Sequence, residues 1–185
     1  MIMHNLLLSL FSLVCGENPN HLWEQGGQLL PCCQRCAGLY AGALAAAVSQ
    51  LLCRPRLSQT YCWMHGLCLA QLGLFIFPWM PDSPFLRMDS GVLFGFGVVA
   101  FLWPAVGERF RRQKKSGYGT GFASTLILTP LVARCGGALG AFLLTSMVVL
   151  GAFMLALLSA VNIASMCRTL PRWGETPSSP NIFRG

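Results

Sequence analysis

Charged residues are scarce in this chain. Only 10% of its 185 residues are Asp, Glu, Lys or Arg, whereas 54% are hydrophobic. About a quarter of the residues of a soluble domain are charged, so this chain has too little polar surface to cover a globule in water. The mean hydropathy of +0.57 agrees with this reading. The composition predicts an integral membrane protein whose main partner is the lipid bilayer.

Acidic residues are fewer than basic residues, and their positions argue against proton-coupled transport. The chain has 6 Asp and Glu against 13 Lys and Arg, and none of the acids lies in the clear apolar runs given below. Proton-coupled transport, which uses carboxylates inside the membrane, is therefore disfavoured. The sequence also contains no Ser/His/Asp set, acidic pair or Walker loop, so no motif marks it as an enzyme.

The net charge of +7 does not indicate nucleic-acid binding. The basic residues occupy short segments between apolar runs, and no basic stripe is interleaved with aromatic residues. We expect no nucleic-acid partner, and membrane topology is the better explanation of the charge.

Apolar runs define the expected fold, because a membrane helix needs about 20 such residues. Four clear runs are Cys36–Cys53, Tyr61–Met80, Ser90–Val106 and Gly137–Ile163. Tyr118–Ala133, which contains Pro130, is a fifth span or a re-entrant or interfacial helix. We predict an all-α fold, a polytopic transmembrane helical bundle with four to five spanning helices. His65 and Gln71 lie inside the second run, where polar side chains usually bond neighbouring helices.

The chain divides into three parts. Residues 1–35 hold an apolar segment, Leu6–Val14, that is too short to span alone, followed by a Cys-rich loop. Residues 36–166 form the transmembrane domain, and residues 167–185 form a polar tail. Basic residues concentrate in the Arg54–Thr60 and Gly107–Gly119 loops, which the positive-inside rule assigns to the cytoplasm. We therefore expect a multi-pass protein of the inner (cytoplasmic) membrane with its Cys-rich loop on the extracytoplasmic side.

Pairs of glycines four residues apart predict close helix packing. Two glycines at this spacing share one helix face and let backbones approach where lipid gives no hydrophobic drive for association. The pairs are Gly38/Gly42, Gly91/Gly95 and Gly136/Gly140. Such faces suit packing within the chain and against other membrane subunits or a second copy.

Cysteine is abundant, with nine residues, and four of them gather near the start of the chain. Cys15, Cys32, Cys33 and Cys36 precede or open the first clear run, and His21 lies among them. The two-residue spacing of Cys33 and Cys36 lets both sulfurs meet one partner. The remaining cysteines are scattered in or near apolar runs and are interpreted as small apolar residues.

Three chemistries fit this cluster, and the sequence does not choose among them. Four Cys or His ligands, drawn from Cys15, His21, Cys32, Cys33 and Cys36, would bind zinc. A C-x-x-C pair at a helix start, next to Arg35, suits thiol–disulfide exchange. In an oxidising compartment Cys15 could instead form a structural disulfide with Cys32, Cys33 or Cys36.

The segment Pro31-Cys32-Cys33-Gln34-Arg35-Cys36-Ala37-Gly38-Leu39-Tyr40-Ala41-Gly42 resembles the P-x-C-x-R-C-x-G-x-Y-x-G signature of a membrane family, domain of unknown function 2085. Members carry a Cys-His-Gln triplet upstream. Cys15 matches its cysteine, whereas Gly16 and Glu17 depart from the other two positions. Arg87 with Gly91 resembles a second family element, an arginine that opens a helix. The resemblance covers about Cys15 to Val106 and implies a multi-helix membrane fold without a known activity.

Arg35 and Tyr40 stand at the mouth of the first span. A guanidinium at this position could fix the outer loop by pairing with Glu17 or Glu24, or bind a lipid phosphate or a quinone oxygen.

Three functions remain open from the sequence. The first is a non-enzymatic accessory or structural subunit of a membrane complex with an extracytoplasmic Cys site. The second is a membrane thiol–disulfide oxidoreductase that uses Cys33 and Cys36. The third is a small-molecule or lipid transporter, supported by the polar residues His65 and Gln71.

Overall fold

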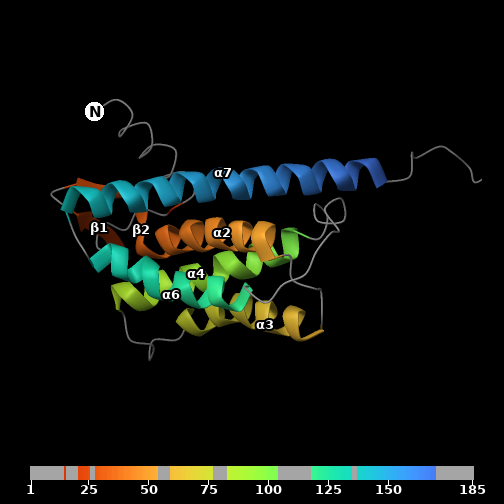
Figure 1. Ribbon diagram of the computed structural model, residues 1–185, viewed down its shortest axis with the longest axis horizontal. Coiled ribbons are helices and arrows are strands. Elements are labelled where there is room, and N and C mark those ends of the chain that lie inside the picture. The colour runs from red at the N-terminus through yellow and green to blue at the C-terminus, as the bar shows by residue number, and fades with distance from the viewer. Residues whose placement is uncertain are drawn as a thin grey trace, which may run out of the picture.

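The computed structural model describes residues 15, 21–25, 28–53, 59–76, 83–103, 118–134 and 137–169. Five α-helices in these ranges form a bundle (Figure 1), which confirms the predicted fold class. They are α2 (Gln34–Cys53), α3 (Gln59–Ala70), α4 (Pro84–Leu102), α6 (Tyr118–Arg134) and α7 (Gly137–Thr169). The apolar segment Leu6–Val14 and the end of the C-terminal tail lie outside the described residues.

Three of these helices are long and apolar enough to cross a membrane. The candidate spans are Gln34–Leu52, Pro84–Leu102 and Gly137–Cys167, and α6 is a shorter apolar helix. The predicted run Tyr61–Met80 is not one regular helix, because α3 changes at Gln71 into a 3₁₀ helix, η2 (Gln71–Ile76). The side-chain amide of Gln71 donates to the carbonyl of Ser90 on α4 at 2.8 Å. At standard rises, α3 and η2 together still extend about 30 Å.

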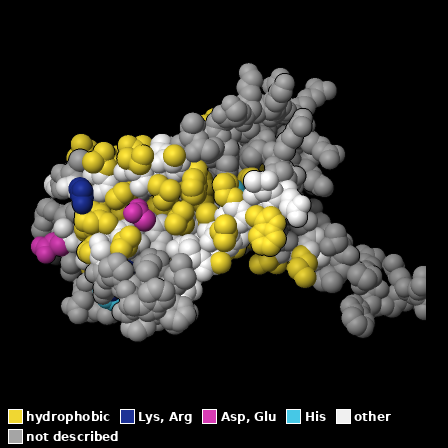
Figure 2. Space-filling view, turned by 90° about the horizontal axis from the view of Figure 1, so that it is seen from below, with side chains coloured by type: hydrophobic (Ala, Val, Ile, Leu, Met, Phe, Trp, Pro, Cys, Tyr) yellow, Lys and Arg dark blue, Asp and Glu magenta, His cyan; other side chains and the backbone are white. Residues whose placement is uncertain are grey.

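The helices alternate in direction. Figure 1 shows α2, α4 and α7 starting at one end of the bundle, whereas α3 and α6 start at the other. We call the first end, where Gln34, Pro84 and Gly137 lie, the hairpin end. Five charged residues lie in the strand or helix turns nearest this end, namely Glu24, Arg35, Arg87, Asp89 and Arg134, whereas Arg168 belongs to the last turn of α7 at the opposite end. On the face drawn in Figure 2, most of the coloured side chains away from this end are apolar.

A β-hairpin at this end was not predicted from the sequence. β1 (Leu22–Gln25) pairs with β2 (Gln28–Cys33) in antiparallel register, with Leu22 opposite Cys33 and Gln25 opposite Gln28. In the sequence two glycines separate the strands, which is a recognised hairpin signal. The last residue of β2 adjoins the first residue of α2, so the hairpin fixes how the chain enters the bundle.

Glycines form the contact between α2 and α4. A Cβ atom at Gly38 or Gly42 would overlap the backbone carbonyl of Met88 or Val92, respectively. In return, a Cβ at Gly91 or Gly95 would overlap the carbonyls of Arg35 and Leu39. The two backbones are therefore in direct contact, in the way that small residues allow in membranes.

The other glycines differ in their placement. Gly140 is buried in α7, and its predicted companion Gly136 lies outside the described residues. Sequence reasoning overlooked Gly151, at which a Cβ would overlap the carbonyl of Tyr40 and so separate α7 from α2.

The start of α4 corrects one expectation. We predicted the third run from Ser90 and counted the clear runs as free of acids. The helix begins six residues earlier, at Pro84 with Ser83 as its N-cap, because proline is well tolerated in the first turn. Asp89 consequently lies inside a candidate span rather than before it.

Candidate metal centre

The strand-to-helix change after Cys33 positions the cysteines. Cys33 ends β2, and Cys36 lies in the first turn of α2. Alternate residues of a strand point to opposite faces, so Cys32 faces away from Cys33. Its side chain is 1% exposed and packs in a core cluster that includes Leu30 and Ala37.

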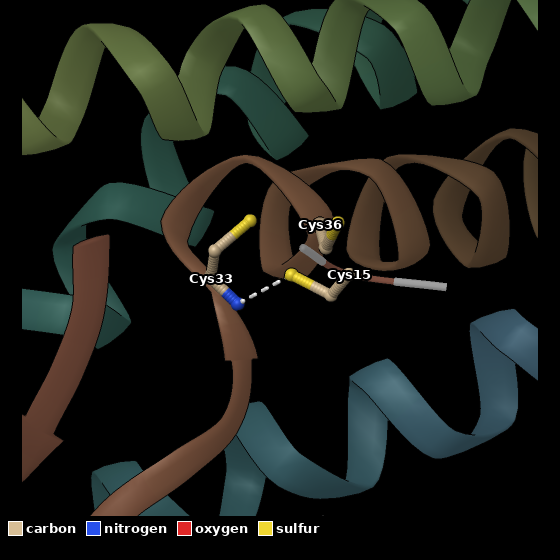
Figure 3. A group of neighbouring side chains, drawn as sticks. All are labelled: Cys15, Cys33 and Cys36. Atoms are coloured by element: carbon tan, nitrogen blue, oxygen red, sulfur yellow. Dashed lines mark hydrogen bonds between the residues drawn. The ribbon is translucent and has the colours of Figure 1, made fainter. Parts of the chain in front are cut away.

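Cys15, Cys33 and Cys36 form one group. Their three Sγ atoms all lie within 4.8 Å of one another, and none of the three cysteines is in a disulfide. The backbone N–H of Cys33 donates a hydrogen bond to the Sγ of Cys15 at 3.3 Å (Figure 3). Cys15 is buried, whereas Cys33 and Cys36 are half-buried. The group therefore has a closed side toward the protein and a more open side at Cys33 and Cys36.

The thiols outside the candidate spans differ in acidity. A hydrogen bond from the Cys36 thiol, with backbone N–H groups at the start of α2, lowers the pKa of Cys33 to about 5. Burial raises the pKa of Cys15, and burial likewise raises the pKa of Cys32. The site thus favours a thiolate at Cys33, and the sulfur of Cys15 lies within 4.8 Å of it.

Three sulfurs at this separation suit a thiophilic metal ion. Zinc–sulfur bonds of about 2.3 Å in a tetrahedral shell place the sulfurs about 3.8 Å apart, which is inside the observed 4.8 Å limit. Thiolates are soft ligands that select zinc or copper(I) over calcium and magnesium. The three cysteines would supply three positions of such a shell.

Two predicted ligands do not join this group. His21 lies half-buried in the turn before β1, and Cys32 is buried in the core. Neither belongs to the set whose ligand atoms converge. The spacing of Cys33 and Cys36 indicated two members of the group, whereas the sequence did not reveal which upstream residue would reach them.

Three further residues were singled out from the sequence, Arg35, Tyr40 and Arg87. Arg35 is half-buried next to Cys36, and Tyr40 is buried one turn further along α2. The backbone N–H of Arg87 donates to the carbonyl of Ser83 at 3.0 Å, which closes the first turn of α4. These positions belong to the first turns of α2 and α4, at the hairpin end of the bundle.

An aromatic contact, also missed from the sequence, covers this end. The rings of Trp23 and Phe85 lie 5.4 Å apart, and the guanidinium carbon of Arg134 lies 4.4 Å from the centre of the Phe85 ring. Phe85 therefore links the hairpin, α4 and α6 through ring packing and a cation–π contact. The isolated positions of these residues in the sequence gave no signal for this.

Comparison with known proteins yields one match. Residues 15–101 match a family model described as "Predicted membrane protein (DUF2085)", which confirms the family resemblance. No curated protein and no solved structure matches the chain. The matched region begins at Cys15 and ends near the close of α4, so it contains all three converging cysteines.

Proposed function

We propose that the three-cysteine group of this membrane protein, whose residues 15–101 match the DUF2085 family model, binds a thiophilic metal ion, with zinc as the expected occupant. In this proposal the protein is a non-enzymatic accessory or structural subunit of a membrane complex. The observation that carries the proposal is the convergence of the Cys15, Cys33 and Cys36 sulfurs within 4.8 Å. Thiol–disulfide exchange needs only two cysteine sulfurs, whereas a metal site would use the third sulfur as a ligand.

The proposed metal has a structural task. Cys15 is distant in sequence from α2, whereas Cys33 and Cys36 belong to the entry into α2. An ion held by all three would tie the chain before the hairpin to the bundle, and structural zinc contributes directly to folding free energy.

The exposed side of α7 supports the subunit part of the proposal. Only 22% of the most apolar stretch of this candidate span is buried within the chain. Leu139, Phe142 and Phe153 are 64–71% exposed. In a bilayer this face would contact lipid or the helices of another subunit.

The orientation rests on the segments between the helices. In the sequence, Arg54 and Arg56 follow α2, and five further basic residues separate α4 from α6. α2 and α4 end, and α3 and α6 begin, at the end of the bundle opposite the hairpin (Figure 1). The positive-inside rule assigns that end to the cytoplasm, so we place the cysteines on the extracytoplasmic side of the inner membrane.

Cobalt(II) titration of the reduced, metal-free protein in detergent tests the proposal. Thiolate ligands give cobalt intense sulfur-to-metal charge-transfer absorption. We expect saturation at one equivalent in the parent protein and a loss of affinity of more than about 100-fold for Cys15→Ser, Cys33→Ser and Cys36→Ser, since even outer-shell changes cost about 10- to 100-fold. Cys32→Ser is the matched control and should still bind cobalt. Equal binding by all four variants, or no charge-transfer band, would refute the site.

Thiol–disulfide exchange is the second candidate, favoured by the Cys33 pKa of about 5 at the start of α2. The Cys33 thiolate would attack a substrate disulfide, forming a mixed disulfide and releasing one substrate thiolate. Cys36 would then lose its proton, attack Cys33 and release the second thiolate, leaving a Cys33–Cys36 disulfide. This route reduces the substrate and oxidises the protein by two electrons.

Removal of Cys15 separates the two candidates. Exchange between Cys33 and Cys36 requires no third sulfur, so Cys15→Ser should retain reduction of a model disulfide under the exchange hypothesis. Metal coordination uses Cys15 directly, and Cys15→Ser should then lose the metal.

A further inference from the structure

A second polar feature lies between α4 and α6, apart from the cysteines. It begins with Pro130, which stands inside α6. Proline has no backbone N–H, so the carbonyl of Leu126, four residues earlier, receives no helical hydrogen bond from position 130. In a membrane span such a freed carbonyl needs another partner.

Thr129 adds a buried oxygen to the same stretch of α6. Its side chain is 1% exposed, and its Oγ1 has no hydrogen-bond partner among the described residues. Thr125, one turn earlier, behaves differently because its hydroxyl donates to the carbonyl of Gly121 at 2.7 Å. Back-bonding of this kind is the usual solution for a helical threonine. Thr129 does not adopt it.

Asp89 presents a matching oxygen from α4. Its Oδ1 is buried and has no hydrogen-bond partner among the described residues, although Asp89 lies within a candidate span. An ionisable residue at such a position marks a functional site by default.

The packing of α4 against α6 places Asp89 and Thr129 at the same level of the bundle, which we call one layer. The rings of Phe96 and Phe122 meet edge to face with centroids 4.9 Å apart. Asp89 lies seven residues before Phe96, and Thr129 lies seven residues after Phe122, so each shares a helix face with its phenylalanine. The helices run in opposite directions, and both residues therefore lie two turns from the ring contact toward the hairpin end (Figure 1).

A second contact brackets the same layer. Phe85 and Arg134 meet on the far side of it, 4.4 Å between ring centre and guanidinium carbon. The carbonyl of Leu126 points along the axis of α6 toward the turn that holds Thr129 and Pro130, so the oxygen that Pro130 leaves without a helical donor lies next to this layer.

We propose that Asp89 Oδ1, Thr129 Oγ1 and the Leu126 carbonyl form a binding site for a monovalent alkali cation, tested here with sodium. All three are oxygen ligands, which hard cations prefer. The single carboxylate balances one positive charge, and broken helices supply cation ligands in membrane transporters through freed carbonyls. This site is independent of the proposed thiophilic metal, since it shares no residue with the cysteines.

Thermal unfolding of the full chain in detergent tests the site. The protein is compared in sodium, potassium and choline chloride at equal ionic strength. An alkali cation should raise the unfolding temperature above that in choline, because a bound ligand stabilises the folded state. Asp89→Asn should abolish this response. Thr129→Val should raise the sodium concentration for half of the effect by about tenfold, the loss expected for one ligand bond.

Thr125→Val is the matched control, since it removes a threonine hydroxyl from the same helix without touching the site. It should keep the parent's sodium response. Equal unfolding temperatures in sodium, potassium and choline would overturn the proposal, as would an undiminished sodium response in Asp89→Asn. If Asp89→Asn does not fold, the comparison of Thr129→Val with Thr125→Val decides. The site is refuted if these two variants need the same sodium concentration for half of the rise in unfolding temperature.

Discussion

The backbone N–H of Cys33 donates to the Sγ of Cys15 at 3.3 Å, across 18 residues of sequence. This bond orients the Cys15 sulfur toward the end of β2, where the chain turns into α2. Cys36 follows within the first helical turn, so three sulfurs meet where strand and helix join. The hairpin thereby builds the site as well as closing one end of the bundle.

The acidity of Cys33 gives a pH-dependent prediction for the metal-free, reduced protein. Alkylation of Cys33 by iodoacetamide should be half-maximal near pH 5, whereas in the denatured chain it should require a pH of about 8.5. The folded pKa is the lower one, so the thiolate stabilises the fold above the unfolded pKa, and this stabilisation is lost as the pH falls toward 5. Mass spectrometry of the modified peptide over a pH series measures both profiles. Coincident profiles would contradict the prediction.

The glycine contact between α2 and α4 gives a prediction about stability. Gly91→Ala should destabilise the fold by about 1–3 kcal/mol, the usual cost of overpacking, because the added Cβ meets the Arg35 backbone. Gly66→Ala is the matched control: no atom lies within 4 Å of a Cβ there, and alanine should be neutral or stabilise α3 by about 0.5–1 kcal/mol. Thermal unfolding in detergent compares the two. Equal effects would show that α2 and α4 are not in backbone contact.

The spanning bundle could be predicted because apolar runs and paired glycines are local signals. Lengths of about 20 apolar residues predicted α2, α4 and α7, and the glycine spacing marked the faces of α2 and α4. The ends of these helices depended on other features. Ser83 and Pro84 start α4 earlier than the hydropathy indicates, which moved Asp89 into the helix. The role of Gly151 depends on which helix crosses α2, and no local pattern encodes that.

Asn162 gives a prediction about the far end of the bundle. Its side-chain amide donates to the carbonyls of Leu102, at the end of α4, and of Leu158, both at 2.8 Å. Asn162→Ala should lower stability by about 0.5–1.5 kcal/mol, because a hydrogen bond between membrane helices is lost. Ile163→Ala, at a 64% exposed position of α7, is the comparison and should change stability less. An unfolding midpoint of Asn162→Ala equal to that of the parent protein would argue against this link.

The proposed orientation predicts which thiols a membrane-impermeant maleimide reaches. A cysteine introduced by Glu24→Cys, at an exposed position of β1, should react in right-side-out vesicles. The exposed Cys167 near the end of α7 should react only in inverted vesicles. The opposite pattern would place the hairpin end in the cytoplasm.

The candidate site was partly predictable. The C-x-x-C spacing marked Cys33 and Cys36, and Cys15 was a candidate because it lies with them near the start of the chain and also matches the cysteine of the family triplet. His21 and Cys32 were equally good candidates because they are potential ligands in the same segment, but the fold leaves their ligand atoms out of the three-sulfur group. Strand alternation turns Cys32 into the core, but that strand was not predicted. The ligand set therefore depended on a hairpin whose signal, the two adjacent glycines between Gln25 and Gln28, was overlooked.

Metal content is the most direct test of the central claim. The protein purified in detergent without added chelator is analysed by elemental mass spectrometry, and its free thiols are counted on the same sample. The proposal predicts about one zinc, or one other thiophilic ion, per chain, with Cys15, Cys33 and Cys36 reduced. A metal-free chain in which Cys33 and Cys36 form a reducible disulfide would contradict it and favour thiol exchange.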